Sequence, residues 1–459
     1  MRESITEPTT TFTPCASLAA LGCHLQQMKL FNPLREQVTI GQKTITHTPT
    51  DKLYDAFITI LAGAHGIVEV NTRLRSEKAL QAAFGPSACA DQSTIQDTLN
   101  AGTAENVSQL MAALTAIYRL HSQGYRHNYQ HRRQLLDVDL SGMPCGPKAA
   151  LATKGYFAKA RNRRGRQLGR VLATHYGEVV MDQVFAGTTS LVTALRPLME
   201  SAAQVLGLTA PQRQRTIVRV DSGGGSVDDI NWVLQQGYQL HTKDYSRQRA
   251  RKLGQSVTEW LSDPQIADRQ VGWVTIPATE YVRDVRRIAV RWPKKNGQWE
   301  YAVVISTLTA REVLEETDQE QADVLSHQAV TLAYVRFYDE RGGGIETAFR
   351  DDKQGLGLTK RSKKRFAAQQ MVVLLGTLAH NVIVWARGWL APHEPSVRRY
   401  GLKRLVRDVF HIGGFLVRNA RGRICQIVLN QQAPLVRGLS RSLDVLLRPA
   451  RIAVNWGQT

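Results

Sequence analysis

The most constraining feature of this 459-residue chain is an alternation of strand and helix patterns between residues 134 and 244. QLLDVDLSG, from Gln134, alternates apolar and polar residues as a strand does. Two more strands follow around a turn at 175–178, and an amphipathic helix capped by Thr188 or Thr189 comes next. TIVRVDSGGGSVDDINWVLQQGYQLHTKD then indicates strand, glycine turn, helix and strand. The order β-β-β-α-β-α-β predicts an α/β fold with helices packed on a mixed sheet.

Positive charge is concentrated near the C-terminus. From Lys353 onward there are 19 Lys/Arg and 3 Asp/Glu, a net of 19 − 3 = +16. The preceding 352 residues hold 59 − 19 = 40 basic and 39 − 3 = 36 acidic residues, a net of +4. A basic surface of this size favours a polyanionic partner, and we expect nucleic acid. No basic amphipathic anchor stands out, so a membrane partner is not expected.

Cysteine usage and apolar runs predict a cytoplasmic protein. The five cysteines contain no C-x-x-C pair and no zinc spacing, which is typical of free thiols in a reducing compartment. The N-terminus lacks the apolar core of a signal peptide. The longest apolar run, from Met371 to Ala386, is interrupted by His380 and Asn381 and indicates a buried helix.

The patterns outside the core suggest further regions. A polar helix beginning near Asp91 resembles the second half of a helix-turn-helix, although a segment of an ordinary helical bundle is the favoured interpretation. The KKNG sequence between two alternating runs predicts a hairpin. We therefore expect, in order, a helical N-terminal DNA-binding region (1–130), the first part of the core (131–246), a β-rich insertion (247–330), the second part of the core (331–390) and a basic C-terminal region (391–459).

Three acidic residues stand at the ends or starts of these elements. Asp139 and Asp221 end the first and fourth strands, which can lie side by side in such a sheet. Gly342–Gly344 predict a break, because glycine costs about 1 kcal/mol in a helix interior, so a helix should begin near Ile345 and carry Glu346. Carboxylate clusters are the ligands that Mg²⁺ and Mn²⁺ prefer, and two such ions support phosphodiester chemistry.

The motifs LDVDLSG, RVDSGGG and YDERGGGIETAFRDDK, in this order, resemble those of the DDE transposases of bacterial insertion sequences, which have an RNase H-like core. The last motif is similar to the family signature Y-x-x-R-x-x-x-E-x-x-x-x-x-x-K. Tyr338 and Arg341 have the family separation, as do Glu346 and Lys353. Four residues instead of three separate Arg341 from Glu346, which puts the role of Arg341 in question.

The resemblance implies a catalytic and metal-binding triad of Asp139, Asp221 and Glu346, with two Mg²⁺ or Mn²⁺ ions. Asp137 is the rival for the first position. The enzyme would cleave DNA at the inverted repeats of an insertion sequence and join the released 3′-hydroxyl to target DNA, as a homodimer in the synaptic complex. The residues expected to contact DNA are Tyr338, Arg341, Arg350, Lys353, Lys360 and Arg361. Two alternatives stay open: a nuclease without strand transfer, and an inactive DNA-binding relic.

Two aromatic residues of the insertion also admit two interpretations. Trp292 and Trp299 flank the predicted hairpin turn. In related enzymes an aromatic residue of the insertion can stack on a flipped base. Packing within the hairpin is the simpler role for both.

Overall fold

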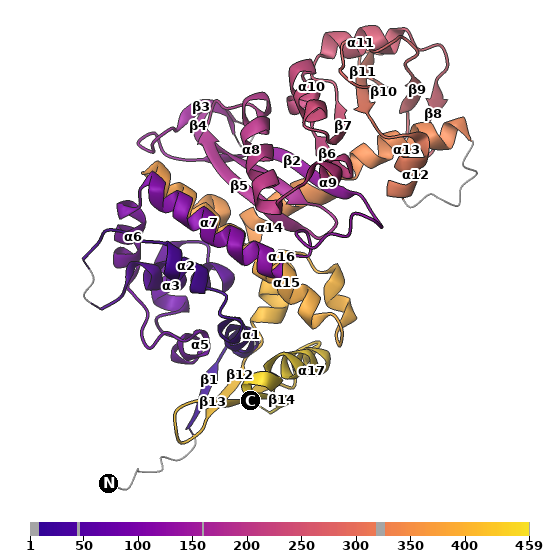
Figure 1. The fold of residues 1–459 in the computed structure, drawn as a ribbon. Coiled ribbons are helices and arrows are strands. Elements are labelled where there is room, and N and C mark those ends of the chain that lie inside the picture. The colour runs from indigo at the N-terminus through magenta and orange to yellow at the C-terminus, as the bar shows by residue number, and fades with distance from the viewer. Residues whose placement is uncertain (1–8, 44–45, 158–159, 318–325, 459) are drawn as a thin grey trace, which may run out of the picture. The chain divides into compact units, whose positions relative to one another are not determined.

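In the computed structural model, the described residues are 9–43, 46–157, 160–317 and 326–458. The contacts of the chain group it into two compact units. Unit 1 comprises Met1–Ser122, Pro144–Ala152 and Phe349–Thr459, and unit 2 comprises Gln123–Met143 and Thr153–Ala348. The expected α/β architecture with a mixed sheet is confirmed (Figure 1). The five predicted region boundaries stay a prediction.

Unit 2 is built on one sheet whose first five core strands run in the order β5-β4-β2-β6-β7. The neighbours β2, β6 and β7 are parallel, whereas β4 and β5 form an antiparallel pair. The first and fourth core strands, β2 and β6, therefore lie side by side as expected. The strands are β2 (Gln134–Pro144), β4 (Ala160–Ala173), β5 (Glu178–Ala186), β6 (Thr216–Val220) and β7 (Gln239–Lys243).

Two predicted core helices are present. Helix α8 (Leu191–Leu206) packs on β4 and β5, and its apolar face is buried. Its N-cap residue is Ser190, not Thr188 or Thr189, and no side-chain hydrogen bond closes the cap. Helix α10 (Val227–Gln235) is capped by Ser226, whose side chain accepts from Asp229 N.

The β-rich segment continues the core sheet. Strand β11 pairs antiparallel with β7, and β10, β9 and β8 follow outward. The predicted hairpin is confirmed, with Pro293 opposite Trp299. The strands are β8 (Leu261–Ser262), β9 (Gln270–Trp273), β10 (Arg286–Pro293) and β11 (Trp299–Ser306). Helix α11 (Arg247–Gln255) packs against β10 and β11.

Helix α13 (His327–Asp339) does not end in a glycine break. Its backbone continues through a π-helical turn, Gly342–Glu346, into α14 (Thr347–Gly355). The expected new helix start near Ile345 is therefore wrong. Packing explains one of the three glycines: a Cβ at Gly344 would lie 2.8 Å from Asp137 Oδ2 and 3.0 Å from Thr174 Cγ2. Close approach to the sheet, rather than a chain break, accounts for that glycine.

Unit 1 combines helices with a small sheet in the order β1-β12-β13-β14. Its longest helices are α3 (Pro49–Leu61), α7 (Ala104–His121) and α15 (Phe366–Leu390). Helix α6 (Gln92–Ala101) begins after Asp91, as expected, and the C-terminal hairpin is formed by β12 (Gly414–Arg418) and β13 (Ile424–Asn430). The remaining strands are β1 (Thr9–Thr13) and β14 (Ala453–Gly457).

Helix α15 is the one helix among the described residues that has the length and hydropathy of a membrane span. Of its most apolar window, 94% is buried inside the protein, which confirms the expectation of a core helix. His380, which is buried in this helix, forms a hydrogen bond between its Nδ1 and Asp352 Oδ1 at 2.8 Å. The imidazole therefore has a hydrogen-bond partner within the core. The five cysteines are free thiols, as expected.

Candidate active site

Two of the predicted acids lie next to each other where β6 ends. Asp221 directly follows β6, whereas Asp139 lies inside β2, which continues to Pro144, so the expectation that Asp139 ends its strand is wrong. Val138 of β2 is paired with Val220 of β6, so Asp139 and Asp221 are the next residues of two adjacent parallel strands. Such strands are about 4.8 Å apart, and residues in register point to the same face. Asp221 also accepts a hydrogen bond from Gly223 N at 2.8 Å, which fixes its carboxylate at the turn.

The turn after Asp221 depends on one glycine. A Cβ at Gly225 would lie 1.9 Å from the carbonyl oxygen of Lys243. Only a residue without a side chain allows the backbone of this loop to pass so close to the end of β7. The SGGG sequence therefore holds the loop that carries Asp221 against the neighbouring strand.

The environment of Asp139 disfavours its ionised form. Burial is the main cause, and the charge of Asp221 adds to it, while Arg341 opposes both. The pKa of Asp139 is raised to about 6. A bound cation would stabilise the ionised forms of these two adjacent carboxylates.

Arg341 is the cation nearest to Asp139 in this structure. Its Nη2 lies 2.9 Å from Asp139 Oδ2, and its Nη1 lies 3.6 Å from Glu346 Oε1. Nη2 also lies 3.2 Å from the carbonyl oxygen of Val138. The Arg341 side chain is only 4% exposed, whereas that of Glu346 is 63% exposed. Arg341 therefore connects the first and third predicted acids, and Glu346 lies at the solvent side of the guanidinium.

The π-helical turn explains how one extra residue fits between Arg341 and Glu346. In an α-helix, residues five apart point in different directions, because one turn takes 3.6 residues. A π-helical turn has i→i+5 hydrogen bonds and brings residues five apart to one face. Gly342–Glu346 form such a turn, and this accounts for the contact between the two side chains.

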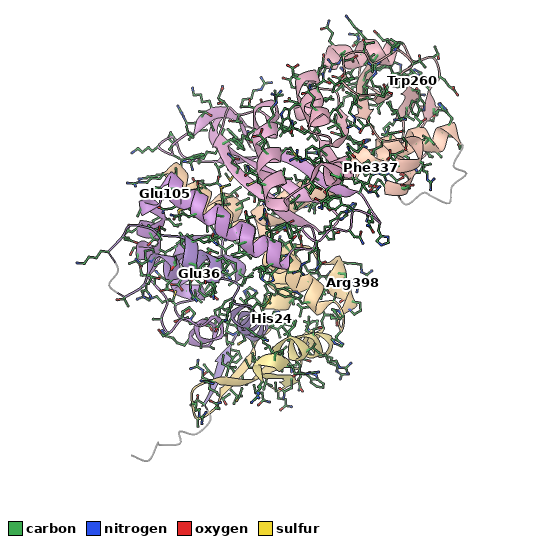
Figure 2. The ribbon with its side chains drawn as sticks, in the orientation of Figure 1. His24, Glu36, Glu105, Trp260, Phe337 and Arg398 are labelled. Atoms are coloured by element: carbon green, nitrogen blue, oxygen red, sulfur yellow. The ribbon has the colours of Figure 1, made fainter. Side chains whose placement is uncertain are left out.

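Asp137, the rival for the first position, is occupied by an ion pair. Arg219 Nε lies 2.7 Å from Asp137 Oδ1, and Nη2 lies 3.0 Å from Oδ2. Both side chains are at most 1% exposed. Arg219 also donates to the carbonyl oxygen of Phe337, a residue labelled in Figure 2, and its guanidinium carbon lies 4.7 Å from the Phe337 ring centroid. Arg219, held by Asp137, thus fixes α13 to the sheet.

Lys243 was missed by the sequence reasoning. Arg219 is paired with His241, so the register continued by two residues places Lys243 beside Asp221. Its Nζ lies 4.1 Å from the ring centroid of Tyr338. The pKa of Lys243 is lowered, and burial is the main cause. The negative charges of Asp339 and Asp221 act in the opposite direction. The available signal was its position at the end of the strand next to the one that Asp221 follows.

Tyr338 packs close to the acids. It is half-buried, and burial raises its pKa, with the charges of Asp221, Asp139 and Glu346 contributing in the same direction and Arg341 opposing them. The phenol is therefore protonated at neutral pH. Its hydroxyl can donate to an acceptor in this acidic cluster.

The other residues expected to contact DNA belong to unit 1 and have different exposures. Arg350 and Lys360 are exposed, and Lys353 is half-buried. Arg361 is buried and donates through Nη2 to the carbonyl oxygen of Ala64, and burial lowers its pKa to about 9. A guanidinium in that position cannot reach a phosphate in this conformation.

A cavity of about 570 Å³ adjoins the acidic edge within unit 2. Its lining includes Ser222, Lys243 and the hairpin residues Trp292 and Trp299. Trp292 packs against the hydrophobic core, as the simpler interpretation predicted. Trp299 is 39% exposed, and the Arg291 guanidinium carbon lies 4.4 Å from its ring centroid. The same guanidinium carbon lies 4.0 Å from the centroid of the Trp260 ring.

The acids match a hard divalent cation in their chemistry, since all three supply carboxylate oxygens. As placed, no group of three His, Cys, Asp or Glu side chains in the described part of the chain could hold a metal ion. The guanidinium of Arg341, between Asp139 and Glu346, is the group that separates the donors. Binding of an ion by all three acids requires this guanidinium to move aside.

Comparison with known proteins gives a likeness to solved structures at low sequence identity. No protein-family model matches the chain, and no curated protein matches it. Among solved structures, the chain is similar to the piggyBac transposase synaptic complex with hairpin DNA, at 12% identity and a TM-score of 0.44. The match covers 88% of this chain and 82% of that chain.

Proposed function

We propose that this protein is a DDE transposase of a bacterial insertion sequence. The observation that carries the proposal is the convergence of the motif residues: Asp139 and Asp221 are side by side in adjacent parallel strands, and Arg341 connects Asp139 to Glu346. The three motifs that resemble the family are separated by 82 and 125 residues in the chain (221 − 139 and 346 − 221). Their acids nevertheless belong to one cluster within unit 2.

In this proposal, Asp139, Asp221 and Glu346 bind the divalent ions, which number two by the family resemblance. Mg²⁺ or Mn²⁺ would activate a water or 3′-hydroxyl and stabilise the leaving oxygen. Lys243, and Arg341 once its guanidinium has moved aside, then supply positive charge beside the acids and the phosphate. The hydroxyl group of Tyr338 donates a hydrogen bond to a phosphate oxygen. A site with this many carboxylates needs those cations to tolerate a polyanionic substrate.

The partner in this proposal is DNA, at the element ends and at the target. The net charge of +16 from Lys353 to the C-terminus favours a polyanion. Synapsis of the two ends of an insertion sequence, with one subunit at each end, would make the enzyme a homodimer on DNA. The cytoplasm, where the nucleoid lies, would be its location.

The test uses purified protein and a labelled duplex that carries the ends of the DNA segment encoding this chain. Asp139→Asn, Asp221→Asn and Glu346→Gln should each abolish Mn²⁺-dependent cleavage and strand transfer while the variants still bind the duplex. Asp228→Asn, which changes an exposed carboxylate on α10, is the matched control and should keep full activity.

The possible outcomes separate the alternatives. Cleaved ends without joined product would identify a nuclease and overturn strand transfer. Binding without cleavage by the unmodified chain would identify an inactive DNA-binding relic. Cleavage that survives all three carboxylate substitutions would show that the catalytic residues lie elsewhere.

A further inference from the structure

The described strands β3 and β4 form a strongly basic antiparallel ribbon that the function proposed above does not use. We call residues 153–155, 157 and 160–165 the basic ribbon; β3 spans Thr153–Phe157. From Leu140 to Gly177 the sequence has no Asp or Glu. Its eight basic residues in that interval are Lys148, Lys154, Lys159, Arg161, Arg163, Arg164, Arg166 and Arg170.

The ribbon starts at the same edge of the sheet as the acids. A Cβ at Gly165 would lie 2.9 Å from the carbonyl oxygen of Met143, and Thr174 N donates to the carbonyl oxygen of Leu135 at 3.0 Å. Strand β4 therefore runs antiparallel to β2. Its first residues lie beside the part of β2 that extends beyond Asp139.

Phe157 attaches the ribbon to the sheet. Its side chain is 1% exposed. A Cβ at Gly142 would lie 2.7 Å from the Phe157 ring, and one at Gly165 would lie 3.1 Å from it. Gly142 is three residues after Asp139, so the ring fixes the ribbon close to the candidate active site.

The exposed side chains of the ribbon are cationic. Lys154, Arg161, Arg163 and Arg164 are all exposed. Lys154 and Arg164 are directly opposite each other in the register, an arrangement of like charges that destabilises a strand pair. A polyanion along the ribbon would neutralise both charges.

We propose that the basic ribbon is a phosphate-backbone contact that holds DNA at the acidic edge of the sheet. This inference rests on the proposed function, because it takes the substrate to be DNA. Among the described ribbon residues no large apolar side chain is exposed, so the surface lacks what binding in a membrane interface requires. Arginine and lysine on an extended ribbon match the repeated phosphates of a duplex.

The experiment measures binding of a labelled 30-base-pair duplex by fluorescence anisotropy, without divalent ions, over a range of salt concentrations. Arg161→Ala/Arg163→Ala should weaken binding about tenfold or more at 0.1 M salt and reduce the slope of log K against log salt by about 2. Arg161→Lys/Arg163→Lys should keep the affinity and the slope, since a phosphate accepts a point charge. Lys252→Ala/Arg311→Ala, which removes two exposed cations elsewhere in unit 2, is the matched control.

Unchanged affinity and slope in the double alanine variant would overturn the ribbon contact, and so would tighter binding of an RNA duplex than of DNA. An equal loss in the matched control would also overturn it, since the effect would then be one of net charge. The cleavage assay keeps the two proposals apart. If the ribbon variant binds DNA weakly but the unmodified chain neither cuts nor joins, the contact stands and the transposase assignment falls.

Discussion

Arg341 donates to the carboxylate of Asp139 across 2.9 Å, inside a site where Asp139 also lies beside Asp221. We expect Arg341→Ala to lower the free energy of unfolding by about 3 kcal/mol in the absence of divalent ions, because Asp139, whose side chain is only 16% exposed, loses its partner. Mn²⁺ should then raise the melting temperature of the variant more than that of the unmodified chain. Thermal unfolding with and without Mn²⁺ measures both effects.

The control for that prediction is Arg341→Lys, which keeps a positive charge and should show an intermediate response. An ion binding where the guanidinium was would be linked to folding, so its stabilisation grows with its concentration. Equal Mn²⁺ shifts in Arg341→Ala and the unmodified chain would contradict the idea that guanidinium and ion compete for the same carboxylates.

Asp137 and Asp139 should respond in opposite ways to the same chemical change. Asp137→Asn leaves Arg219 buried without its carboxylate, and we expect a loss of about 3–5 kcal/mol in urea unfolding. Asp139→Asn should change stability less, because losing the Arg341 contact is offset by relief of repulsion from Asp221. The Asp139→Asn variant should instead lose DNA cleavage. A larger stability loss from Asp139→Asn would reverse the roles that we assign.

The sequence could predict the neighbourhood of Asp139 and Asp221 because strand alternation and strand order depend on local patterns. Two residues that continue the register of parallel neighbouring strands must lie together, whatever surrounds them. Lys243 obeys the same rule one strand further on, yet a lone lysine at a strand end carries no chemical signature. Its proximity to Asp221 and Tyr338 becomes visible only with the register.

Other features depended on tertiary contacts that local propensity does not contain. Three glycines indicate a helix break by their intrinsic cost, but here α13 continues through them because Gly344 passes close to Asp137. Arg361 carries a charge that suggests a surface position, but it is buried against Ala64. The net charge of the first 352 residues does not reveal the basic ribbon, because acidic residues elsewhere in that stretch offset its positive charge.

The two glycines at 343 and 344 offer a matched pair of substitutions. Gly344→Ala would place a Cβ 2.8 Å from Asp137 Oδ2, so we expect a loss of about 1–3 kcal/mol and reduced cleavage. Nothing lies within 4 Å of a Cβ at Gly343. Gly343→Ala should therefore be neutral or stabilise the helix by up to about 1 kcal/mol. Urea unfolding compares them, and equal losses in both variants would contradict the close approach at Gly344.

Asp55 of α3 should make the stability of the protein depend on pH. It is 1% exposed, and burial raises its pKa from 3.8 to about 7, despite a hydrogen bond from Ala90 N to Oδ2 at 2.8 Å. The folded state therefore holds a proton that the unfolded chain releases near pH 4. This contribution is complete below the unfolded pKa and is lost as the pH rises through the folded one, at up to about 1.4 kcal/mol per pH unit.

Asp55→Asn tests that dependence, since the amide oxygen can still accept from Ala90 N and carries no charge at any pH. Urea unfolding at intervals between pH 5 and pH 8 should show the unmodified chain losing stability relative to the variant as the pH rises. Above pH 7, where Asp55 must ionise inside the helical core, the variant should be the more stable protein. Parallel curves for the two proteins across this range would mean that Asp55 is ionised in the folded state at pH 5, and that burial does not control its protonation.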